Sequence, residues 1–164
     1  MWWRGRIEKN KSLLLTLTIP YIDNIFEHIL DNGEASKQNY EQWLELFEEM
    51  VCTSDYKHLL EVDIHFRKIM VDNEECLAIP FSDAYDKTYE KAIKVGQKLE
   101  GNRTIKKLLG NSKYAHKIKT KKVKFSTTEF GGKRTKDSII LKMSELEQLG
   151  MTNTLEIARN NYEK

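Results

Sequence analysis

The sequence has few cysteines and no long apolar run. Its 164 residues include two cysteines, Cys52 and Cys76, and these show no CxxC spacing. Such usage predicts reduced thiols in an intracellular protein, and it argues against a disulfide framework or a cysteine-based zinc site. The apolar run nearest the N-terminus, Leu13 to Ile19, has seven residues and contains two threonines. It is too short for a bilayer crossing or a signal peptide, so we expect a cytoplasmic protein without membrane contact.

Acidic residues are missing from one stretch of the chain. Between Gly101 and Lys124 there is no Asp or Glu, whereas nine residues are Lys or Arg. Residues 101–143 hold thirteen basic and two acidic residues, a net charge of +11, and residues 21–100 hold eight basic and eighteen acidic ones, a net of −10. The formal charge of +2 for the whole chain conceals these two opposed blocks. Such asymmetry is the strongest sequence signal for a charged partner.

The overall composition is that of a folded domain. Apolar residues make up 40% of the chain and charged residues 32%, which is enough apolar material to build a core. We predict a single, mainly helical α+β domain with a small antiparallel β-hairpin in its C-terminal third. Residues 1–100 would form an acidic helical body, and residues 101–164 a basic part packed on it. An all-α fold with a hairpin insertion is the alternative.

The period of the apolar residues predicts the individual elements. The apolar residues predict helices over residues 36–51, 83–99 and 152–162, and a short helix over 113–119. A capping box of Ser144 and Glu147 predicts a helix over 144–150, and a cap with Gly110 predicts a short one over 104–109. Residues 56–71 fit either a helix or an alternating strand, and we favour the helix because of the length of the segment. Residues 76–80 form a short apolar link. From residue 121 the period becomes two, and Gly131-Gly132 supplies a turn, which predicts a hairpin over 121–143.

The basic block is the first candidate site. Lysine and arginine side chains pair with phosphates, and the residues expected to do so are Arg103, Lys106, Lys107, Lys113, Lys117, Lys119, Lys121, Lys122, Lys133 and Arg134. The predicted order of two short helices around Gly110 and then two strands is that of a helix-turn-helix with a wing. However, Lys106 and Asn111 stand where such a motif places small or apolar residues. Lysine also outnumbers the residues that read bases, so we expect phosphate contact rather than sequence readout.

A second candidate site combines His58, Glu61 and His65. On a helix, spacings of three and four place them on one stripe, a geometry suited to a metal ion. On a strand, Glu61, His65 and their alternate neighbours line one face, which suits acid–base chemistry. The sequence places no further ligand or nucleophile beside them, and a polar face with one or two histidines is usually solvated surface.

These observations predict a small intracellular nucleic-acid-binding protein without catalytic activity or cofactor. It would bind DNA or RNA through the lysines of residues 101–143. One alternative is a protein-interaction module, such as an inhibitor or immunity-type factor, whose opposed charge blocks bind an acidic protein or a second copy of the chain. Another alternative is a metal-dependent hydrolase that uses His58, Glu61 and His65.

Overall fold

The structure is a computed structural model that describes residues 39–51, 60–127 and 131–162. His58, the first 38 residues and residues 128–130, just before the predicted turn at Gly131-Gly132, lie outside the described residues. Residues 39–164 cluster as one unit. Among the described residues no helix combines the length and the apolar character that a bilayer crossing requires.

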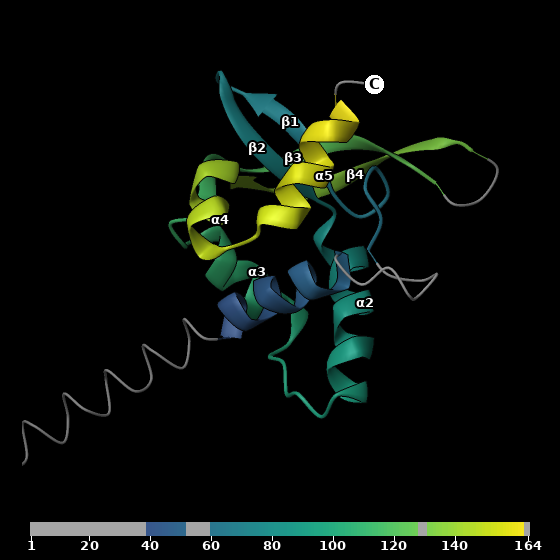
Figure 1. Cartoon of the computed structure of the whole chain (residues 1–164), viewed down its shortest axis with the longest axis vertical. Helices are drawn as coiled ribbons and strands as arrows, with labels where there is room; N and C mark the ends of the chain where they lie inside the picture. Colours follow the sequence, from purple (N-terminus) through teal and green to yellow (C-terminus); the bar gives the residue numbers. More distant parts are fainter. Residues whose placement is uncertain (1–38, 52–59, 128–130, 163–164) are drawn as a thin grey trace, which may run out of the picture. The chain divides into compact units, whose positions relative to one another are not determined.

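A four-stranded antiparallel sheet forms the centre of this unit (Figure 1). Its strands are β1 (Arg67–Val71), β2 (Glu74–Ile79), β3 (Ala115–Ser126) and β4 (Lys133–Lys142), in the spatial order β1-β2-β4-β3. Asp72 and Asn73 join β1 to β2 with φ angles of 51° and 63°. Asp and Asn tolerate this left-handed conformation, so the two residues form a tight hairpin turn. The far end of the β3–β4 hairpin projects beyond the helices (Figure 1).

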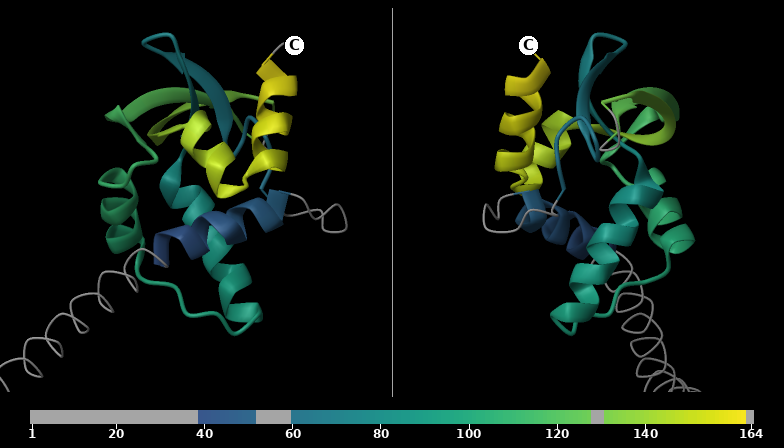
Figure 2. Two further views of the ribbon diagram at one scale, coloured as in Figure 1. Left: turned by 60° about the vertical axis from the view of Figure 1, so that its left-hand side comes forward. Right: turned by 90° about the vertical axis from the view of Figure 1, so that its right-hand side faces the viewer.

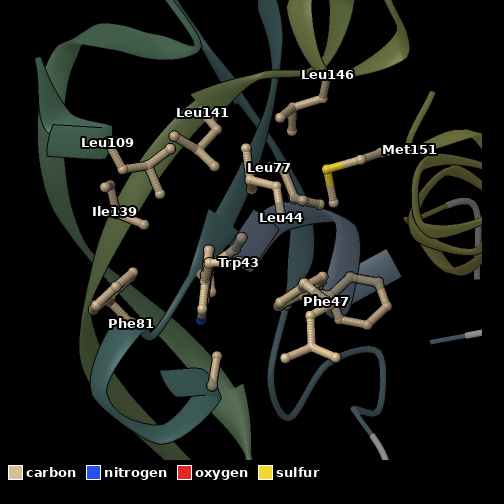
Figure 3. Close-up of a cluster of buried hydrophobic side chains, with 14 of the residues drawn as sticks. Trp43, Leu44, Phe47, Leu77, Phe81, Leu109, Ile139, Leu141, Leu146 and Met151 are labelled. Atoms are coloured by element: carbon tan, nitrogen blue, oxygen red, sulfur yellow. The ribbon is translucent and has the colours of Figure 1, made fainter. Parts of the chain in front are cut away.

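Helices cover one face of the sheet. They are a helix that includes residues 39–51, then α2 (Phe81–Lys94), α3 (Asn102–Gly110), α4 (Met143–Leu149) and α5 (Thr152–Tyr162). The helices and the sheet share one apolar core (Figure 3), whose fully buried members include Trp43, Leu44, Phe47, Leu77, Ile79, Ile105, Leu109, Ile139, Leu141 and Leu146. Within this core the indole N–H of Trp43 donates to the Thr88 hydroxyl at 2.7 Å. The packing therefore fixes α2 and α3 against the sheet.

The opposite face of the sheet holds a smaller apolar cluster. Its members are Val71, Cys76, Ala78, Val123, Phe125 and Ile140. The two outer strands of the sheet, β1 and β3, approach each other around this cluster. The Arg67 guanidinium of β1 donates to the Lys124 carbonyl of β3, and the Ser126 N–H of β3 donates to the carbonyl of Asp63, just before β1, both at 2.8 Å. The sheet is therefore curled, with β3 bending toward the β1 side (Figure 2). Within this curl Val123 and Phe125 of β3 are buried, whereas Lys122 and Lys124 on the other face of the strand are exposed.

The predicted α+β class is confirmed, with helices and an antiparallel sheet that contains the predicted hairpin as β3–β4. The all-α alternative is wrong, because the hairpin is half of a four-stranded sheet. Helices are confirmed within 39–51 and at α2, α3, α4 and α5, although α2 starts at Phe81 and ends at Lys94 instead of at residue 99.

Three predicted elements are wrong. The favoured helix over 56–71 is wrong in its described part, residues 60–71, which form a turn at 63–65 followed by β1, because pairing with β2 satisfies the backbone of residues 67–71. The apolar link at 76–80 is most of β2, a strand buried on both faces. The short helix at 113–119 is the start of β3, where a register shift between Ala115 and Thr120 inserts extra residues and hides the strand period. Without a second helix, the helix-turn-helix with a wing is excluded.

Candidate nucleic-acid interface

Helix α3 presents a row of basic side chains on the face opposite its core contacts. Ile105 and Leu109 are fully buried and hold the helix against the core. Arg103, Lys106 and Lys107 are spaced by three and four residues, so they lie together on another face. The local sequence thus forms a helix that is apolar on one side and cationic on the other.

The cationic face of α3 forms one wall of a groove, and β3 forms the other. The groove has a volume of about 320 Å³ and is lined by Arg103, Lys106, Lys107, Gly110, Asn111, Lys119, Thr120 and Ile139. The Lys119 ammonium group donates to the side-chain oxygen of Asn111 at 2.7 Å, which holds that lysine at the groove. None of the described residues that line the groove is acidic. Four cationic residues therefore line one groove, whose exposed surface is mostly apolar. Long basic side chains contribute apolar surface through their stems and carry the charge at their ends.

The strand register extends this cationic surface along the projecting hairpin. Thr120, Lys122, Lys124 and Ser126 alternate onto one face of β3, and Ser126 is paired with Lys133 of β4. Ile139, opposite Thr120, lies on the same face but is buried where the helices cover the sheet. We define the basic track as Arg103, Lys106, Lys107, Lys119, Lys122, Lys124 and Lys133. From Thr120 to Ser126 the strand part spans about 20 Å at the usual rise per residue.

The basic track carries little compensating charge. Six of its side chains are exposed and Lys106 is half-buried. Among the described residues, none of its members forms an ion pair with an acidic side chain. Asp137, opposite Lys122, is the acidic residue that the register places on the same face. In contrast, Lys136 of the same strand is paired with Asp83 of α2.

The remaining predicted binding residues lie elsewhere. Lys121 and Arg134 are on the opposite face of the hairpin, since their partners are Ser138 and Phe125. Arg134 instead lines a second cavity of about 460 Å³, which also contains Asp83 and Asp137 and is therefore of mixed charge.

The last two predicted binding residues are not on the track either. The Lys113 ammonium group sits 5.2 Å from the centre of the Tyr114 ring. Lys117 is exposed in the irregular part of β3. Only part of the predicted set is thus brought together, and Lys124, which was absent from that set, joins it.

The predicted site around Glu61 and His65 does not form on a helix. The segment is a turn in which the Glu61 backbone N–H donates to Nδ1 of His65 at 2.9 Å. His65 is buried, and this burial lowers its pKa below the ordinary value of 6.5, against the opposing effect of the Glu61 carboxylate. His58 lies outside the described residues. The helical stripe that would hold a metal is therefore excluded, and His65 has a structural role.

A different cluster joins three residues that are distant in the sequence: Glu74, Cys76 and His116. Their ligand atoms lie within 4.8 Å of one another, and Nε2 of His116 is 3.4 Å from the Glu74 carboxylate. Nδ1 of His116, however, accepts the Ile118 backbone N–H at 3.0 Å, so the ring proton of the neutral imidazole is on Nε2. A histidine that binds a metal donates from its second nitrogen instead of accepting there. The arrangement does not fit a metal ion.

The thiol of this cluster is also unsuited to catalysis. Cys76 is fully buried, and burial raises its pKa to about 11, so the reactive thiolate is scarce near neutral pH. The occupied Nδ1 of His116 cannot take up a proton from it. The cluster is therefore a structural contact at the start of β3. No sequence signal pointed to it, because β2 and β3 bring its members together.

The comparisons with known proteins add no assignment. No protein-family model, curated protein or solved structure matches this chain.

Proposed function

We propose that this chain is a nucleic-acid-binding protein that contacts phosphates through the basic track. The observation that carries the proposal is the groove between α3 and β3. It gathers Arg103, Lys106, Lys107 and Lys119 with no acidic residue among its described lining. Cations gathered in this way repel one another, and a bound anion relieves that repulsion.

The extent of the track favours a polyanion over a single small anion. Beyond the groove, Lys122, Lys124 and Lys133 continue the positive charge along the same face of the hairpin. A nucleic-acid backbone presents phosphates at regular intervals over this length, and each lysine that pairs with one releases a condensed counterion. Binding is therefore expected to weaken steeply with salt.

The chemistry of the track favours binding that is independent of sequence. Six of its seven residues are lysines, and only Arg103 has the planar fork that recognises a guanine edge in bidentate fashion. Lysines on a groove wall and a strand face position a backbone without specifying its bases.

Binding by the full-length chain tests the proposal. Fluorescence anisotropy with labelled oligonucleotides at about 50 mM salt compares the Lys106→Gln/Lys107→Gln variant with a control, Lys94→Gln/Lys98→Gln. Lys94 and Lys98 are exposed and lie off the track, and their loss changes the net charge equally. We expect the α3 variant to bind about tenfold more weakly or worse, and the control to match the wild type.

Two results would overturn the proposal. One is the absence of binding to every oligonucleotide at low salt. The other is an equal loss in both variants, which would mean that net charge alone matters. Absence of binding together with a concentration-dependent increase in particle size would instead favour the protein-interaction alternative.

A further inference from the structure

We infer that the basic track takes double-stranded rather than single-stranded nucleic acid. This inference rests on the proposed function and deepens it. It draws on the burial of aromatic rings, on the chemistry of the cations and on the rigidity of the elements that carry them.

No described aromatic ring of residues 101–143 is available for stacking. Proteins that hold single strands stack bases on exposed aromatic rings. In the described part of residues 101–143 the rings are those of Tyr114 and Phe125, which are 2% and 0% exposed. The Tyr114 hydroxyl donates to Glu41 at 3.0 Å, and Phe125 belongs to the apolar cluster inside the curled sheet. Neither ring offers a face to a base.

Charge density also distinguishes the two ligands. The described rings of residues 101–143 offer no face to a base, so for the described residues the free energy of binding comes from phosphate contacts. A duplex carries one negative charge per about 1.7 Å of its axis, and a protein contact releases more counterions from it than from a single strand. A surface on which cations greatly outnumber the single acidic residue of the same face, Asp137, therefore prefers the duplex.

The cations of the basic track have a fixed arrangement. The cations stand on α3 and on two strands in fixed register, so their spacing is set before the ligand arrives. The strand part of the track extends for about 20 Å along the curled hairpin (Figure 2). A duplex is stiff over more than ten times that length, so its phosphates already have fixed relative positions. A single strand has to be ordered first, at a cost in conformational entropy.

The test compares four ligands of equal length, about 20 nucleotides per strand: duplex DNA, duplex RNA, and oligo(dT) and oligo(U) as unstructured single strands. The full chain is titrated against each by fluorescence anisotropy at the same salt concentration. We expect at least one duplex to bind about tenfold more tightly than either single strand. The two duplex arms show which helical form fits the track better.

A matched pair of variants tests whether the preference for duplexes depends on the basic track. Lys122→Gln/Lys124→Gln removes two charges from the track face of the hairpin, and Lys121→Gln/Arg134→Gln removes two from the opposite face of the same strands. We expect the first variant to lose most of the duplex preference and the second to keep it.

The outcomes separate this inference from the function on which it rests. Single strands that bind as tightly as duplexes, with affinity still dependent on Lys122 and Lys124, would overturn the inference and leave the proposed function intact. A duplex preference that is unchanged in the Lys122→Gln/Lys124→Gln variant would also overturn it. Failure of all four ligands to bind would overturn both.

Discussion

The Glu48 carboxylate binds the start of α5 through Thr154. It accepts the Thr154 backbone N–H at 3.1 Å and the Thr154 hydroxyl, while its other oxygen accepts the Asn153 N–H at 2.9 Å. The first N–H groups of a helix have no partner within the helix, and a negative charge there is favourable. A glutamate on the helix at 39–51 thus caps a helix near the other end of the chain.

Replacing Glu48 with alanine is expected to destabilise the fold by about 1–2 kcal/mol, because two backbone donors and the buried Thr154 hydroxyl lose their acceptor. Urea unfolding followed by circular dichroism measures the change. Glu45→Ala is the control, since Glu45 is exposed on the same helix. Its effect is expected to stay within about 0.5 kcal/mol. Equal effects of the two variants would contradict the capping role.

The Trp43→Phe variant is expected to cost about 2 kcal/mol of stability. The Thr88 hydroxyl donates to the Tyr85 carbonyl at 2.9 Å and accepts the indole N–H of Trp43, so the variant leaves a buried acceptor unsatisfied and a small void. The same unfolding measurement tests this. A Trp43→Phe chain as stable as the wild type would show that the hydrogen bond contributes nothing.

The buried His65 makes stability depend on pH. Because its pKa is lowered in the folded chain, the unfolded chain binds more protons just below pH 6.5, so stability is complete above that pH and falls as the pH drops through the folded pKa. The His65→Gln variant keeps an acceptor for the Glu61 N–H and does not titrate. Between pH 7.5 and 5.5 we expect the wild type to lose more stability than the variant in urea titrations. Parallel losses would exclude His65 as the source.

The Cys76 thiol is expected to resist thiol reagents in the folded chain. It is fully buried and its pKa is raised to about 11, so both access and thiolate formation are suppressed. The measurement is the rate of reaction with a chromogenic disulfide at pH 8, in a Cys52→Ser background and with and without urea. We expect slow reaction in buffer and rapid reaction in urea. Rapid reaction in buffer would mean that the β2 position of Cys76 is wrong.

The sequence predicted most of the helices because their information is local. Residues 39–51, α2, α4 and α5 each carry apolar side chains at helical spacing, and most of these face the core. Tyr89 and Ile93 of α2 and Ile157 of α5 are exceptions, because they are exposed. The strands depend on distant partners. In β2, Leu77 and Ile79 face the main core while Cys76 and Ala78 face the smaller cluster, so no alternation of apolar and polar residues marks the strand.

The candidate site was predicted only in outline. The charge asymmetry of the sequence identifies residues 101–143 as the basic block. The spacing of Arg103, Lys106 and Lys107 is enough to place them on one face of α3. Which hairpin cations join them depends on the register of β3 with β4, and the irregular segment before Thr120 hides that register. For this reason Lys121 and Lys124 exchange roles relative to the sequence-based expectation.

The most direct test of the basic track is the salt dependence of duplex binding. Seven phosphate contacts predict a slope of about −6 for the logarithm of the association constant against the logarithm of salt concentration. Lys122→Gln/Lys124→Gln is expected to reduce the magnitude of that slope by about 2, and Lys121→Gln/Arg134→Gln to leave it unchanged. A slope near zero in the wild type, or the same reduction in both variants, would contradict the account.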